Sequence, residues 1–329
     1  LRCCANFCKI LLNLKPAPVG LVRLTNTVKV AVLMLLKSAF CFFLFIETIK
    51  SAKRVTTNGV VNGGIGKSKV QCGTLNQWGA VEKAKPGAKH RNPFPWTVSI
   101  LYLDGNYLRD LCVGSVIESN NPNSSDLILT GSACFEQINL ERIYIFGGAK
   151  DLTDSYQADR QVGFVKSVFK LPIKKNLDLY QSNLAVVKLV KPFLYNAKLT
   201  PVCLPAANEP PLPAGTLCYL SGSTPPKGAI DQTMLRILSA EFCRKNVSFP
   251  FNPDVQICGE KLDPVYMLPI GGPVVCRKYN RYVQYAVFSF PAPLKSWKKD
   301  TPIKMKDFVG IMCTVTNQLQ FIKNSIRAA

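Results

Sequence analysis

Imidazole chemistry in this sequence depends on one residue, because the chain contains a single histidine, His90. His90 lies in the basic segment KPGAKHRNPF, which holds no serine or cysteine that it could activate. Since histidine is the most frequent general base near neutral pH, a site that needs such a base has few candidates here. We interpret His90 as an exposed loop residue, and a serine–lysine pair remains the open alternative for nucleophilic chemistry.

The thirteen cysteines of the chain include no C-x-x-C pair and no adjacent histidine, which is unlike a zinc or iron–sulfur site. Nine of them are spread from Cys72 to Cys313, a pattern typical of disulfides formed in an oxidising compartment. The glycines at 63, 64 and 66 have neither the preceding strand nor the following helix of a phosphate-binding loop. The sequence therefore predicts disulfides, no metal and no cofactor.

Short apolar runs separated by turn residues are the main pattern of the chain after residue 95, and they predict strands. The runs are Trp96–Tyr102, Leu111–Ile117, Leu127–Thr130, Ile143–Phe146, Val162–Leu171, Leu184–Val190, Leu217–Leu220, Met234–Leu238, Val255–Cys258, Val274–Cys276, Tyr282–Phe290 and Val309–Val315. Only the tail, Asn317–Ala329, has helical spacing of apolar residues. With 47% hydrophobic and 19% charged residues, the chain is not a disordered polyelectrolyte. An all-β fold with a C-terminal helix is expected.

Several motifs resemble a known family in their order and rough spacing. They are FPWTVSI at 94–100, CVGSVI at 112–117, LTGSACF at 129–135, NLAVVKL at 183–189, PVCLP at 201–205, CYLSG at 218–222, ICG at 257–259 and IGGPVVC at 270–276. Over about residues 72–329 the chain resembles the chymotrypsin-like, or trypsin-family, serine proteases. The resemblance implies two six-stranded antiparallel β-barrels. The segments CGTLNQWG at 72–79 and AKPG at 84–87 resemble the region before the protease domain in arthropod serine protease homologues.

The catalytic triad positions that the resemblance assigns are occupied by other residue types. Ala133 stands where the family has its general-base histidine, Asn183 replaces the aspartate, and Ile270 replaces the nucleophilic serine. A methyl group takes up no proton, an amide does not stabilise an imidazolium as a carboxylate does, and isoleucine offers no oxygen. The sequence therefore predicts a chain without hydrolytic activity.

Activation and substrate binding depart from the family in the same way. Pro269 replaces the aspartate that pairs with the new N-terminus after activation cleavage, and Leu268 replaces a glycine of the oxyanion hole. No Arg/Lys-Ile/Val-x-Gly activation site precedes Phe94. At the specificity pocket, Pro264 falls near the base, and the wall reads Ser289-Phe290-Pro291. We expect no activation by cleavage and no substrate-like insertion of a peptide side chain.

The resemblance also implies the disulfide pairing. The pairs are Cys72 with Cys203, Cys112 with Cys134, Cys218 with Cys276, and Cys243 with Cys258. Cys313 is left over, either as a buried thiol in the last strand or as an intermolecular bridge.

The chain carries 41 Lys and Arg against 20 Asp and Glu, and its densest basic stretch is LKSWKKDTPIKMKDF at 294–308. The candidate anion-binding residues in it are Lys295, Lys298, Lys299, Lys304 and Lys306. They could meet an acidic protein, a sulfated glycan or an anionic microbial polymer, and a solvated loop is the alternative. Asn123 and Asn246 begin glycosylation sequons.

The segment from Met34, MLLKSAFCFFLFIETIKSAK, has the proportions of a secretory signal peptide, which we place at 34–52. An uncleaved membrane anchor is the alternative. Residues 1–33 are then either upstream sequence outside the protein or a basic N-terminal extension of it, 53–83 is a linker and 84–329 the protease-like domain. A secreted domain would rarely meet nucleic acid, so we expect no such partner.

Three hypotheses for function follow. The first is a secreted, non-catalytic homologue that binds an extracellular protease or its zymogen in a proteolytic cascade, as arthropod homologues do in innate immunity and melanisation. The second is an adhesion or pattern-binding protein that uses its basic surface. The third is a residual serine endopeptidase.

Overall fold

The structure is a computed structural model that describes residues 70–75, 94–148, 160–172, 182–224, 229–262, 269–298, 304 and 307–329. Residues Lys67–Ala329 form one compact unit. The expected extension, signal peptide and most of the linker lie outside the described residues, and so does His90. Within the described part of the chain, no helix is long and apolar enough to cross a membrane.

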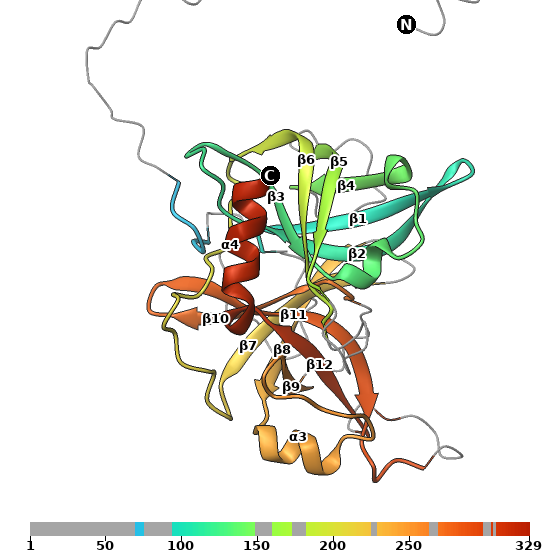
Figure 1. Cartoon of the computed structure of the whole chain (residues 1–329), viewed down its shortest axis with the longest axis vertical. Helices are drawn as coiled ribbons and strands as arrows, with labels where there is room; N and C mark the ends of the chain where they lie inside the picture. Colours follow the sequence, from blue (N-terminus) through green and yellow to red (C-terminus); the bar gives the residue numbers. More distant parts are fainter. Residues whose placement is uncertain are drawn as a thin grey trace, which may run out of the picture. The chain divides into compact units, whose positions relative to one another are not determined.

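The first barrel is closed, and its strands follow the order β1-β2-β3-β6-β5-β4 (Figure 1). Every neighbouring pair in it is antiparallel. Its strands are β1 (Thr97–Asp104), β2 (Tyr107–Val116), β3 (Ser124–Thr130), β4 (Ile143–Gly147), β5 (Gln161–Lys170) and β6 (Ala185–Leu194). Buried residues alternate or run together along these strands because one face of each strand fills the barrel interior.

The second barrel is also closed and antiparallel, with the order β10-β11-β12-β9-β8-β7. Its strands are β7 (Leu217–Thr224), β8 (Ala229–Ile237), β9 (Gln256–Lys261), β10 (Pro273–Lys278), β11 (Arg281–Pro293) and β12 (Phe308–Thr314). Each of the predicted apolar runs overlaps one strand of the two barrels. The predicted all-β fold of two six-stranded barrels is therefore confirmed.

Helices are more numerous than the sequence pattern indicated. The predicted C-terminal helix is present as α4 (Leu319–Ala328), after the 3₁₀ turn η4 (Thr316–Gln318). A further short helix, α3 (Ala240–Asn246), forms before β9 without helical spacing of apolar residues, capped by the Ser239 side chain, which accepts a hydrogen bond from the Phe242 amide. Short 3₁₀ turns also occur at η1 (Ser132–Phe135) and η2 (Leu140–Arg142).

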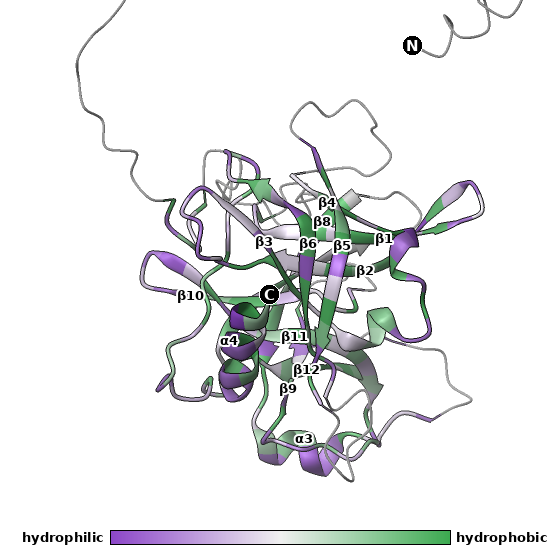
Figure 2. Cartoon of the chain, turned by 45° about the horizontal axis from the view of Figure 1, so that its top comes forward, coloured by the Kyte–Doolittle hydropathy of each residue, from purple (hydrophilic) through white to green (hydrophobic). Residues whose placement is uncertain are grey.

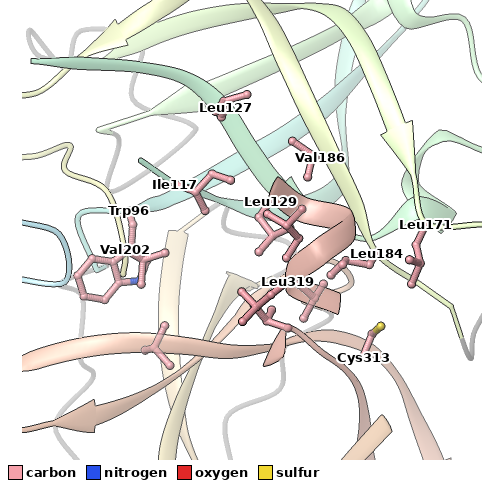
Figure 3. Packing of buried hydrophobic residues seen from close by; sticks show 14 of the residues in the cluster. Trp96, Ile117, Leu127, Leu129, Leu171, Leu184, Val186, Val202, Cys313 and Leu319 are labelled. Carbon is pink, nitrogen blue, oxygen red and sulfur yellow. The ribbon is translucent and has the colours of Figure 1, made fainter. Parts of the chain in front are cut away.

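The largest hydrophobic cluster joins both barrels to α4. Trp96, Ile117 and Leu129 enter it from the first barrel, Cys313 from β12, and Leu319 from α4 (Figure 3). In Figure 2 the residues of α4 change between hydrophilic and hydrophobic along the helix, as expected when one side packs on the barrels. The cluster fixes the two barrels relative to each other.

A buried hydrogen bond between the two barrels constrains how they pack against each other. The Ser115 hydroxyl on β2 donates a hydrogen bond to Oε1 of Gln284 on β11, at 2.6 Å. Both residues are fully buried. Since a buried amide oxygen without a donor is costly, this contact favours one arrangement of the barrels.

Four disulfides hold the fold, and they join the pairs that the family resemblance implies. They are Cys72–Cys203, Cys112–Cys134, Cys218–Cys276 and Cys243–Cys258. Cys313 is the one free cysteine among the described residues, and it is fully buried. Burial raises the pKa of its thiol to about 12. The structure therefore supports the buried thiol, and this burial argues against a bridge to another chain.

Candidate functional site

The loops that carry Ala133 and Asn183 are neighbours because their strands pair. Thr130, the last residue of β3, is the partner of Ala185, the first residue of β6. Ala133 follows β3 on η1, and Asn183 lies just before β6. Antiparallel pairing thus brings the end of one strand and the start of the other to the same edge of the first barrel.

Asn183 holds η1 in place through its side-chain oxygen. The Ala133 amide donates a hydrogen bond to Oδ1 of Asn183 at 2.9 Å, and the Ser132 hydroxyl donates to the same oxygen at 3.4 Å. Gly131 permits this approach, because a Cβ built there would lie 2.8 Å from Oδ1. The carboxamide is fully buried, and its nitrogen has no hydrogen-bond acceptor among the described residues. Asn183 therefore acts as a structural tether.

Ile270 reaches the same region from the second barrel. The Val113 amide donates a hydrogen bond to the Ile270 carbonyl at 2.9 Å, which links the turn before β10 to β2. The Ile270 side chain is half-buried against the apolar cluster of the first barrel, which includes both cysteines of the Cys112–Cys134 disulfide. An aliphatic side chain thus takes part in the packing between the barrels.

The turn beside Ile270 requires glycine. Gly271 has a φ of +79°, and a Cβ at this position would lie 2.3 Å from Oγ1 of Thr130 and 2.4 Å from the Val113 carbonyl oxygen. The next amide, of Gly272, donates to the Pro269 carbonyl at 2.7 Å and closes the turn. This close approach places residues 270–271 directly beside Gly131 and the start of η1.

The structure thus brings together the three positions at which the resemblance expects a triad, at the junction of the two barrels. The side chains present there are a methyl group, a buried carboxamide and an aliphatic chain. None of them can accept a proton at neutral pH or attack a carbonyl. The nearby Ser132 hydroxyl is buried, and its partners are the Ser182 carbonyl and the Asn183 amide oxygen, neither of which is a base.

The expected wall of the specificity pocket lies on β11. Ser289 is buried, and its hydroxyl has no partner in the described part of the chain. Phe290 packs edge-on against Phe249, with ring centroids 5.0 Å apart, and Pro291 pairs with Gly310 of β12. Pro264 and Leu268 lie outside the described residues. Proline cannot donate a backbone hydrogen bond, so residue 291 has no N–H to offer an extended peptide.

The basic stretch begins attached to α3. The Lys295 amide donates to the Asn246 carbonyl at 2.7 Å, and its ammonium donates to the Lys245 carbonyl at 2.8 Å. Lys298 and Lys304 are exposed. Trp297 is half-buried against Phe308, with ring centroids 5.4 Å apart. Of the other predicted anion-binding residues, Lys299 and Lys306 lie outside the described residues.

Lys295 also borders an open groove of about 620 Å³ that the sequence did not indicate. Its lining residues are Arg244, Val247, Ser248, Phe249, Pro250, Phe251 and Lys295. Arg244 was missed because 51 residues separate it from Lys295, and only the fold of the second barrel makes them neighbours. The pair of basic residues at 244 and 245, in the last turn of α3, was the available signal.

The two sequons differ in their surroundings. Asn123 is exposed in the turn before β3, although the Ser125 hydroxyl of the same sequon is buried and donates to the Ile117 carbonyl at 2.6 Å. Asn246 is half-buried, and its side-chain nitrogen donates to the Phe242 carbonyl at 2.9 Å. Glycosylation of Asn246 would replace this contact at the end of α3. Glycosylation of both sites stays a prediction.

No group of three histidine, cysteine or acidic side chains in the described part of the chain is arranged to hold a metal ion. In comparison with known families, the model of the trypsin family matches residues 86–290. This match spans more than half of the 329 residues and runs from before β1 into β11. The two closed barrels and the family match agree, and the chain belongs to the trypsin family.

Proposed function

We propose that the chain is a secreted, non-catalytic serine protease homologue that acts as a binding partner, cofactor or regulator in an extracellular proteolytic cascade. The observation that carries the proposal is the occupancy of the triad positions by Ala133, Asn183 and Ile270 within an otherwise complete double barrel. A trypsin-type domain with four disulfides is typical of an extracellular protein.

The way these residues are used supports a structural role for the former catalytic region. Asn183 holds η1 through the Ala133 amide, and Ile270 packs between the barrels. Each side chain stabilises the fold through a contact that involves no proton transfer. A chain of this kind keeps a rigid, protease-shaped surface, which suits recognition of a protease or of the zymogen that a protease cleaves.

Adhesion through the basic surface is the second candidate, and the exposure of Lys295, Lys298 and Lys304 favours it. A long-range positive field attracts sulfated glycans and anionic microbial polymers without a shaped site. Such binding would weaken steeply with salt, since exposed charges are screened.

Crosslinking capture from extracellular fluid of the source organism separates the two candidates. The bait is the protein expressed from Met34, and the matched bait carries Gln at Lys295, Lys298, Lys299, Lys304 and Lys306. We expect mass spectrometry to identify a trypsin-family protease or zymogen with wild-type bait. Recovery of glycans or microbial polymers alone, and only with the basic bait, would replace the cascade role by adhesion.

A further inference from the structure

We propose that the groove beside α3 binds an acidic peptide segment of the partner, with an apolar residue of that segment seated against Phe249 and Phe251. This groove is defined by its lining residues Arg244, Val247, Ser248, Phe249, Pro250, Phe251 and Lys295. The inference rests on the proposed binding function and assigns a place and a ligand chemistry to it. The groove lies at the end of the second barrel, away from the junction that holds Ile270.

The groove is built on a fixed frame. The Cys243–Cys258 disulfide joins α3 to β9, and Lys295 is bonded to the carbonyls of Lys245 and Asn246 at the end of the helix. The Ser248 amide and hydroxyl both bond to the Pro293 carbonyl, at 3.0 and 2.9 Å. The segment after α3 and the end of β11 are thus held together before any ligand arrives. A preformed site loses less conformational entropy on binding.

Charge favours an anionic ligand. Arg244 and Lys295 are exposed, and within the described residues neither of them forms an ion pair. The Lys295 ammonium uses one of its three donors on the Lys245 carbonyl, which holds the charge at the rim of the groove. Exposed Lys245 and Lys298, in the same two segments, add to the positive field. A carboxylate is the matching group.

Apolar lining favours a peptide over a glycan. Val247 is buried in the groove wall, and Phe249 and Phe251 are half-buried, each packed on the apolar cluster beneath. Half-buried aromatic rings beside cations suit a ligand with both carboxylates and an apolar side chain. A sulfated glycan is strongly hydrated and would remove less apolar area of the rings from water than an apolar side chain of a peptide does. The groove volume of about 620 Å³ is large enough for a short segment.

The test measures binding of short fluorescent peptides to the secreted protein by anisotropy, after trimming of N-glycans because the Asn246 sequon borders the groove. One peptide carries Asp and Glu on both sides of a Phe, and the second has Ala in place of that Phe. The double variant Arg244→Glu/Lys295→Glu is compared with the matched control Lys191→Glu/Lys323→Glu, which reverses exposed lysines on β6 and α4. The control has the same change in net charge.

We expect wild-type protein and the control to bind the Phe peptide, and the groove variant to bind it about tenfold more weakly. The Ala peptide should bind wild type about tenfold more weakly than the Phe peptide, because the apolar contact is lost. Equal binding by the two double variants, no binding to wild type, or equal binding of the two peptides would overturn the proposal. Stronger binding of a sulfated oligosaccharide than of the Phe peptide would assign the surface to glycans instead.

Capture from extracellular fluid distinguishes failure of the groove from failure of the proposed function. If wild type and the groove variant recover the same protease or zymogen equally well, the cascade role stands and the groove is not its docking site. If wild type recovers no such protein, the cascade role itself fails.

Discussion

At the scale of single residues, the turn that carries Ile270 depends on the absence of a side chain at Gly271. Gly271→Ala would place a methyl group against Thr130 and the Val113 carbonyl. We expect the free energy of unfolding to fall by about 3 kcal/mol, from the contact and from the positive φ together. Denaturant unfolding followed by tryptophan fluorescence measures the change.

Gly215 provides the matched control for this substitution. It also has a positive φ, of +87°, but a Cβ there would meet nothing within 4 Å. Gly215→Ala should therefore lower the free energy of unfolding by only about 1 kcal/mol, which is the cost of the positive φ alone. An equal loss in both variants would show that the approach of the second barrel to Thr130 does not constrain residue 271.

A half-buried acid that contacts the second barrel gives a pH-dependent prediction. Glu209 accepts hydrogen bonds from the Lys278 ammonium, at 2.6 Å to each oxygen, and from the Tyr285 hydroxyl at 2.8 Å. These contacts, with Lys278 as the largest cause, lower the pKa of the Glu209 carboxyl from its usual value of 4.5. The stabilisation that these contacts provide is therefore complete above the pKa that the Glu209 carboxyl has in the unfolded chain. It is lost as the pH falls through the lower pKa that the carboxyl has in the folded protein.

Glu209→Gln should reduce stability at neutral pH by about 1 kcal/mol, a modest value because Lys278 is partly exposed. The difference from wild type should shrink towards zero on acidification, because both proteins then carry an uncharged side chain. Urea unfolding across the acidic range measures it, with Glu141→Gln on the exposed turn η2 as the control. A difference that stays constant with pH would contradict this account of Glu209.

At the scale of elements, the two barrels are joined by the Ser115 to Gln284 hydrogen bond between β2 and β11. Ser115→Ala would leave the buried Gln284 oxygen without this donor, and we expect a loss of about 1–3 kcal/mol in unfolding free energy. Ser99→Ala on β1 is the matched control, because the Ser99 hydroxyl is buried without a partner among the described residues. Removing the Ser99 hydroxyl should leave the free energy of unfolding nearly unchanged. Similar losses for both variants would show that the interbarrel bond adds little.

Elements with a clear period could be predicted from the sequence, and short ones could not. Each of the twelve strands contains an apolar run, and α4 shows apolar residues at helical spacing. The helix α3 has seven residues, of which only Cys243 is buried, so no periodic stripe marks it. The grouping of the strands into two six-stranded barrels came from the family resemblance, and the order of strands within each barrel came only from the structure, since periodicity alone says nothing about which strands pair.

The positions of the candidate-site residues could be predicted from the sequence, but their contacts could not. Ala133, Asn183 and Ile270 stand inside recognisable motifs, so their positions could be assigned before the structure. The bond from the Ala133 amide to Asn183 joins residues 50 apart in the chain, and no local pattern signals it. Arg244 and Lys295 are 51 residues apart, and they line the same groove because the segment after β11 folds against α3.

At the scale of the whole molecule, the two barrels, the four disulfides and the shared core are complete, while the triad positions carry Ala133, Asn183 and Ile270. At the positions where a trypsin-family enzyme carries its triad, Ile270 packs against the first barrel from the second, and Asn183 holds η1 within the first barrel. We therefore propose that the two-barrel architecture serves recognition, through the surface of the second barrel beside α3.

Labelling with a fluorophosphonate probe tests whether the chain lacks a catalytic serine, because this probe reacts with an activated serine nucleophile. The purified protein is labelled before and after limited treatment with trypsin, and trypsin, separated by mass, serves as the positive control. We expect no label on this chain under either condition, since residue 270 offers no oxygen and Ala133 no base. Labelling of the chain, above all after proteolysis, would contradict the account and would identify a working serine peptidase.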